Sequence, residues 1–187
     1  MVQPLSVPAD PGLSPDFDRA RRLSRIMTVV LAIGFWVTLV WLAVQPVLLI
    51  WPTAGGWGSV GRSAAVIAPA SLSFGPRAGA VLAIFLGVAP SLLVLHHGRR
   101  VFANFAMGQV FAPPNIAHIR AIGLWLVVSG VAPGVEQVLF NLFAGVRPVA
   151  VDLDLRPLLI VFGAAVYVAA YVMAEAQRLA DDNAAIV

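Results

Sequence analysis

The sequence predicts an all-α membrane protein with four transmembrane helices and two short extended segments on its outer side. Composition is the first observation: the chain is 60% hydrophobic and 11% charged, with a mean hydropathy of +0.90, unlike a soluble domain. The second is a set of four apolar runs long enough to cross a bilayer core, for which about 20 helical residues suffice. The predicted spans cover about 26–51, 78–97, 121–144 and 157–175.

The segments outside the spans are predicted to be short tails. Residues 1–18 carry four prolines and three aspartates and bury nothing, so we expect a disordered cytoplasmic tail. The first span is too long for the apolar part of a signal peptide and is expected to stay as an anchor. The four spans form one domain over residues 19–178, and residues 179–187 form a second cytoplasmic tail.

Two outer segments show strand-like patterns. Pro148–Leu155 alternates apolar and polar residues, and Ser63–Phe74 is an apolar, serine-studded run too short to cross a bilayer. Both should lie on the periplasmic side, where they could pair as a small sheet over the helix ends. Trp51 and Trp57 suit the outer interfacial belt.

The inner link between the second and third spans is predicted to hold a short amphipathic helix. Val101–Phe111 places phenylalanines one turn apart behind a pair of arginines, which suits the membrane interface. Pro113 and Pro114 should end that helix, and Asn115 should cap the third span.

The arginines predict the topology. Eight are expected on one side: Arg19, Arg21, Arg22, Arg25, Arg99, Arg100, Arg120 and Arg178. The other side has Arg62, Arg77, Arg147 and Arg156. Because the side richer in arginine is cytoplasmic, both termini should lie inside, and the protein should be a multi-pass protein of the bacterial inner membrane.

Small residues at helical spacing predict close helix packing. Gly79, Ala83 and Gly87 form one stripe in the second span, and Gly130 and Gly134 form another in the third. Such stripes let helices approach closely in lipid. Packing within the chain explains them, and a homo-oligomer face is the alternative.

Glu136 is the candidate polar site, because it is the one carboxylate well inside an apolar span, with Gln137 beside it and Asn141 about a turn later. An intramembrane acid suggests an ion path or a proton relay. The simpler explanation is a structural glutamate bonded to Ser129, Gln45 or a backbone, since no other span offers a base.

Other chemistry is not expected. The chain lacks a glycine-rich phosphate loop and the serine-hydrolase and zinc-protease motifs, so we predict no enzyme. His96, His97 and His118 fall at the inner interface without a carboxylate to complete a metal set, so we predict no cofactor and no metal. Glu175 and Arg178 should form an ion pair. The sequence lacks a basic stripe interleaved with aromatic residues, the pattern typical of nucleic-acid binding, so we predict no direct binding of nucleic acid.

Three stretches of the sequence carry a resemblance to known proteins. They are the basic entry to the first span (Arg19–Ile33), the residues Gly108, Phe111, Asn115, Ile119, Arg120, Ile122 and Gly123, and the tail residues Leu179, Asp181, Asp182, Asn183 and Val187. In these stretches the chain resembles a bacterial family of four-span membrane proteins of unknown function. The resemblance implies a four-helix inner-membrane protein, in many genomes encoded near a small Cro-like helix-turn-helix regulator, and it implies no activity.

The expected function is therefore that of a non-catalytic membrane protein that interacts with, senses for or modulates a protein partner in the membrane or cytoplasm, with the lipid bilayer as its surroundings. One alternative is a small proton-coupled transporter that uses Glu136. Another is an accessory subunit of a larger membrane complex.

Overall fold

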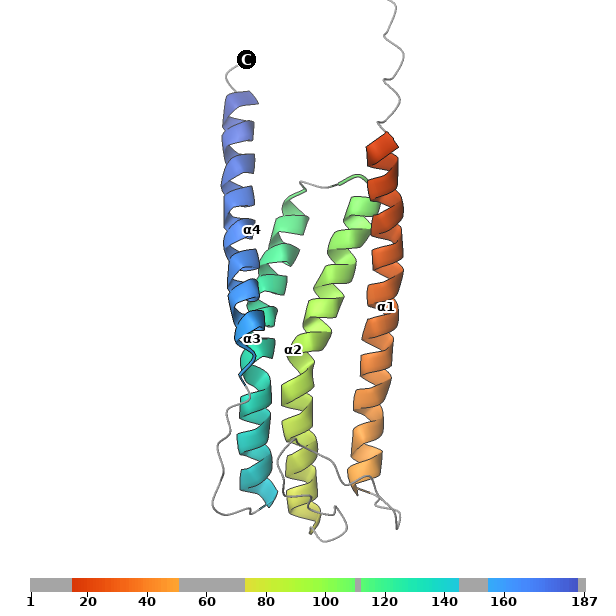
Figure 1. Cartoon of the computed structure of the whole chain (residues 1–187), viewed down its shortest axis with the longest axis vertical. Coiled ribbons are helices and arrows are strands. Elements are labelled where there is room, and N and C mark those ends of the chain that lie inside the picture. Colours follow the sequence, from red (N-terminus) through yellow and green to blue (C-terminus); the bar gives the residue numbers. More distant parts are fainter. Residues whose placement is uncertain (1–14, 51–72, 110–111, 145–154, 185–187) are drawn as a thin grey trace, which may run out of the picture.

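The protein is all-helical over the residues that the structure, a computed structural model, describes: 15–50, 73–109, 112–144 and 155–184. The helices are α1 (Pro15–Ile50), α2 (Phe74–Ala106), α3 (Pro113–Ala144) and α4 (Pro157–Ala184) (Figure 1). Each is long and apolar enough to cross a membrane. The prediction of four helices that are long and apolar enough to cross a membrane is confirmed.

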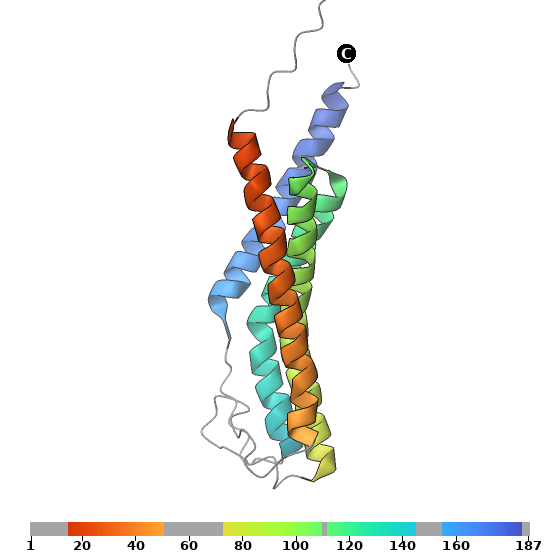
Figure 2. The same cartoon turned by 90° about the vertical axis from the view of Figure 1, so that its right-hand side faces the viewer.

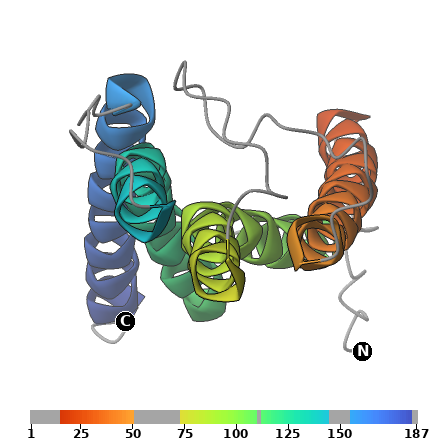
Figure 3. The ribbon, with the colours of Figure 1, turned by 90° about the horizontal axis from the view of Figure 1, so that it is seen from below.

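The helices form an open row in chain order. Packing is confined essentially to the consecutive pairs α1–α2, α2–α3 and α3–α4. Viewed along the helices, the row curves, with α1 and α4 at its two ends (Figure 3). Because the helices alternate in direction, the first residues of α1 and the last residues of α4 lie at the same end of the molecule along the helix axes (Figure 1). This end is called the terminal end below.

Burial separates the two inner helices from the two edge helices. In the most apolar windows of α2 and α3, 28% of the residues are buried, against 11% in α4 and 6% in α1. The buried apolar side chains include Leu42 of α1 and Ala83 and Ile84 of α2. The core is therefore a thin seam along the row, and most large apolar side chains face outward, as lipid contact permits.

The predicted outer strands fall largely outside the described residues. No strand occurs within the described ranges. Of the two segments, Ser73 is the N-cap of α2, Phe74 is its first residue, and Leu155 lies two residues before α4, so none of these three positions belongs to a sheet. The remaining positions, and the interfacial tryptophans Trp51 and Trp57, lie outside the described residues.

The prediction of a separate interfacial helix at Val101–Phe111 is wrong. α2 continues without a break through Gly98 to Ala106, where Met107 and Gly108 turn the chain. A Cβ at Gly98 would lie 3.2 Å from Leu31 of α1, so this glycine allows α1 and α2 to pack closely. It does not interrupt α2. Gly108 adopts φ 82°, which glycine allows without strain and which ends the helix.

The two prolines of the link between α2 and α3 begin a helix, whereas the sequence predicted that they end one. Pro113 and Pro114 are the first residues of α3. Proline is tolerated there because the first N–H groups of a helix have no intrahelical acceptor. Asn115 is thus the third residue of α3 and not its cap, and its N–H donates to the carbonyl of Ala112 at 2.8 Å.

α4 is displaced along the helix direction toward the terminal end (Figures 1 and 2). The N–H of Arg156, just before α4, donates to the carbonyl of Gly130 at 2.9 Å, in the middle of α3. Pro133 lies next to this contact and removes one helical donor from α3. At its other end α4 continues to Ala184, so residues 179–184, predicted as tail, are helical. α1 likewise begins at Pro15, inside the predicted N-terminal tail.

Candidate functional site

Glu136 lies between α2 and α3, directly against the backbone of Gly87. The side chain is half-buried. A Cβ built on Gly87 would overlap Oε2 of Glu136 and lie 2.8 Å from its carboxyl carbon. The absence of a side chain at Gly87 thus creates the space that the carboxyl group occupies. The side chain of Glu136 is therefore part of the packing between α2 and α3.

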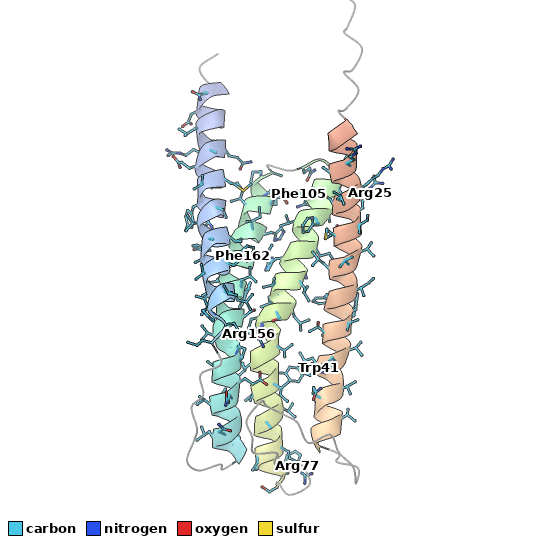
Figure 4. All side chains as sticks on the ribbon, in the orientation of Figure 1. Arg25, Trp41, Arg77, Phe105, Arg156 and Phe162 are labelled. Carbon is cyan, nitrogen blue, oxygen red and sulfur yellow. The ribbon has the colours of Figure 1, made fainter. Side chains whose placement is uncertain are left out.

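Arg156 is the basic group near this acid. It lies close enough to Glu136 to act on its charge electrostatically, and Figure 4 shows it at mid-height of the row, beside α3. The sequence analysis looked for a base only within the other spans, so it did not consider Arg156, which directly precedes α4. Arg156 does precede a helix, as expected, but the displacement of α4 carries it to the middle of α3.

Ser129, which the sequence suggested as a hydrogen-bond partner of Glu136, does not have that role. Its hydroxyl is buried and has no hydrogen-bond partner among the described residues, so it does not bond to Glu136. Gln137 is half-buried and Asn141 is 5% exposed, and both take part in polar interactions. The three predicted polar residues thus share one stretch of α3, and Asn141 is the most deeply placed.

The small residues of the predicted stripes lie in helix contacts. Gly79 and Ala83 are buried, and a Cβ at Gly79 would lie 2.6 Å from Cδ1 of Phe143 on α3. Gly130 and Gly134 are buried as well. A Cβ at Gly130 would lie 3.1 Å from the carbonyl oxygen of Arg156, so this glycine faces the start of α4.

Backbone-to-backbone contact between α3 and α4 involves glycines that the stripe analysis missed. A Cβ at Gly123 would lie 2.6 Å from the backbone nitrogen of Tyr167, and one at Gly163 would lie 2.7 Å from the carbonyl oxygen of Gly123. A spacing of seven could have revealed them, because Gly123 precedes Gly130 by seven residues and Gly163 precedes the buried Ala170 by seven.

A second polar group, at the terminal end of the α2–α3 contact, was also missed. Nδ1 of His97 and Nδ1 of His118 lie 3.0 Å apart, so one ring donates and the other must be neutral to accept. Asn104 donates to Oδ1 of Asn115 at 2.6 Å, and the amide of Asn115 donates to the carbonyl of Gln109. Asn115 is fully buried. These bonds join α2 to α3 beside the turn.

Among the described residues, no group of three or more metal-ligating side chains could hold a metal ion. The predicted ion pair is confirmed: Nη2 of Arg178 lies 2.8 Å from Oε1 of Glu175 at the surface of α4. Comparison with known protein families, with curated proteins and with solved structures gives no match.

Proposed function

We propose that this chain is a non-catalytic membrane protein that binds a transmembrane helix of another membrane protein along α1. The observation that carries the proposal is the position of two tryptophans, Trp36 and Trp41, which are 58% and 49% exposed. Tryptophan ordinarily gathers at the membrane interfaces. Trp36 is ten residues into the first apolar run, or about 15 Å, which is near the middle of a bilayer core.

The setting of α1 supports this assignment. Among the described residues, the main packing of α1 is on α2. It includes the contact of Leu42 with Ile84 and the bond from Nε of Arg21 to the carbonyl of Ala106 at 3.2 Å. Figure 4 places Trp41 on the side of α1 that looks toward α2. The ring nevertheless stays half exposed, so a helix lying beside α1 and α2 would contact it. Aromatic side chains of this kind dominate protein interfaces.

Site-specific photocrosslinking in intact membranes tests the proposal. Benzoylphenylalanine replaces Trp36 or Trp41 in turn, which keeps an aromatic ring at the site. Leu158 of α4, which is 84% exposed, is the control. We expect a discrete adduct with a different protein at both tryptophan positions and only lipid adducts at Leu158. Only lipid adducts at all three positions, or an adduct with a differently tagged second copy, would contradict a separate partner.

The orientation is part of the proposal. The arginine distribution supports cytoplasmic termini in a bacterial inner membrane, with a partner that is either regulated by this protein or assembled with it as a larger complex. The resemblance to the four-span family fits both versions. Alkaline phosphatase fused at Gly56 should be active and fused at Gly108 inactive, whereas the reverse pattern would reject this topology.

A small proton-coupled transporter is the second candidate, and the approach of Arg156 to Glu136 favours it. An acid within the apolar zone can take up and release a proton during transport, and an arginine, which stays charged, can act as the counter-ion of its ionised form. Glu136→Gln removes the ionisable proton and keeps the size of the side chain. Under the first proposal this variant folds and keeps its partner. Loss of a proton-driven flux in vesicles, with normal folding, would favour the transporter.

A further inference from the structure

We propose that a groove between α3 and α4 at the terminal end binds the phosphate group of an anionic membrane phospholipid through Arg120. The groove has a volume of about 260 Å³ and is lined by Pro113, Ile116, Ala117 and Arg120 of α3 and by Ala174 and Gln177 of α4. Pockets for whole drug-sized ligands measure roughly 300–1,000 Å³. This one therefore suits a headgroup whose acyl chains lie outside it, along the helices.

Arg120 is held in place and retains donors for an anion. Its guanidinium carbon lies 4.2 Å from the ring centroid of Tyr171, a cation–π contact that fixes the side chain across the α3–α4 seam. Its Nε is buried and has no hydrogen-bond partner among the described residues. The donors that a phosphate in the groove can reach are therefore the terminal Nη groups, which are not buried in this way. Guanidinium groups bind phosphate with two parallel hydrogen bonds.

The start of α3 does not provide this binding by itself. Pro113 and Pro114 have no N–H group, and the N–H of Asn115 already donates to Ala112. The first three positions of α3 therefore offer no free backbone donor to an anion. Arg120 must carry the charge, and Gln177 is the polar side chain that faces it across the groove.

The surroundings favour a lipid as the source of the phosphate. The groove is bordered by apolar side chains, and it lies at the end of the row where the arginine-rich start of α1 is found. The nearby Glu175 is already paired with Arg178, so its charge is compensated. An arginine-rich end of a membrane protein faces the cytoplasmic leaflet, where anionic phospholipids accumulate.

The test uses the full chain, purified in mild detergent and stripped of lipid, with the melting temperature followed during lipid titration. Phosphatidylglycerol should stabilise the protein in a saturable way. Diacylglycerol with the same acyl chains, which lacks the phosphate, should not, and inorganic phosphate should have no effect in the same concentration range. Stabilisation by diacylglycerol would reject the phosphate contact, and stabilisation by inorganic phosphate would reject the lipid source.

Variants locate the site. Arg120→Gln should weaken phosphatidylglycerol binding about tenfold to a hundredfold, the range for loss of a charge-assisted hydrogen bond. Arg22→Gln, which removes an exposed arginine from α1 at the same end of the molecule, should leave the affinity unchanged. Ala117→Phe fills the groove from an exposed position and leaves Arg120 in place, so it tests the site even where Arg120→Gln fails to fold. Unchanged binding in Ala117→Phe would overturn the proposal.

Discussion

The two seams that hold α3 in the row use different contacts. Toward α4, the backbones themselves meet at Gly123 and Gly163. Toward α2, side chains fill the spaces that glycines leave, as Glu136 does at Gly87 and Phe143 does at Gly79, and polar bonds such as Asn104–Asn115 join the helices near the turn. A backbone cannot move aside, whereas a side chain can rotate. The α3–α4 seam should therefore tolerate substitution far less than the α2–α3 seam.

The largest effect is expected from Gly123→Ala. The added methyl would lie 2.6 Å from the backbone nitrogen of Tyr167, so the helices must separate. We expect a loss of about 3 kcal/mol, the upper end for overpacked cores, measured by unfolding in a denaturing detergent. Gly34→Ala is the control, because its methyl would lie 3.8 Å from Leu95, an ordinary contact. Similar losses for the two variants would remove the distinction between the seams.

Asn115→Leu should have the next largest effect, because it breaks the polar part of the α2–α3 seam. The amide of Asn104 and the carbonyl of Gln109 both lose a partner when the buried Asn115 is replaced. Unpaired buried groups of this kind cost about 2 kcal/mol. Asn183→Leu, at an exposed position on α4, should leave the stability nearly unchanged in the same measurement. A loss no larger than that of the control would show that these bonds contribute little.

Gly87→Ala should cost about 1 kcal/mol, less than the change at Gly123, because the obstacle is the mobile end of Glu136. A double-mutant cycle sharpens this comparison. In a Glu136→Ala background the carboxyl group is gone and only the Cβ of residue 136, at 3.1 Å, remains close. Gly87→Ala should therefore cost clearly less there than in the natural chain. Equal costs in the two backgrounds would show that the side chain of Glu136 does not occupy the space beside Gly87. Leu86→Ala, at an exposed neighbouring position, serves as the control.

The smallest effect is expected from Glu175→Gln, outside both seams. Its ion pair with Arg178 is at the surface, where such pairs contribute less than about 0.5 kcal/mol. The unfolding midpoint should stay within experimental error of the natural chain. A clear loss would mean that this end of α4 makes contacts beyond the pair.

The sequence predicted part of the candidate site, namely Glu136, but not the residues that approach it. Glu136 was singled out because a charge inside an apolar run is visible in the sequence, but Arg156 was assigned to an outer loop. Its approach depends on where α4 begins relative to α3, and the bond from Arg156 to Gly130 shows this register. Similarly, Asn104 and Asn115 are ordinary polar residues in the sequence, and only the turn at Gly108 brings them together.

The sequence alone determined the number of helices and their approximate spans. In lipid a helix satisfies its backbone hydrogen bonds within one segment, so a local apolar run is sufficient to specify it. The tertiary structure decided which glycines meet a backbone, that α2 continues past Gly98, that α4 is displaced and that the row stays open. These features depend on which faces and which heights of separate helices meet. That choice is made by packing between residues far apart in the chain, which no local pattern contains.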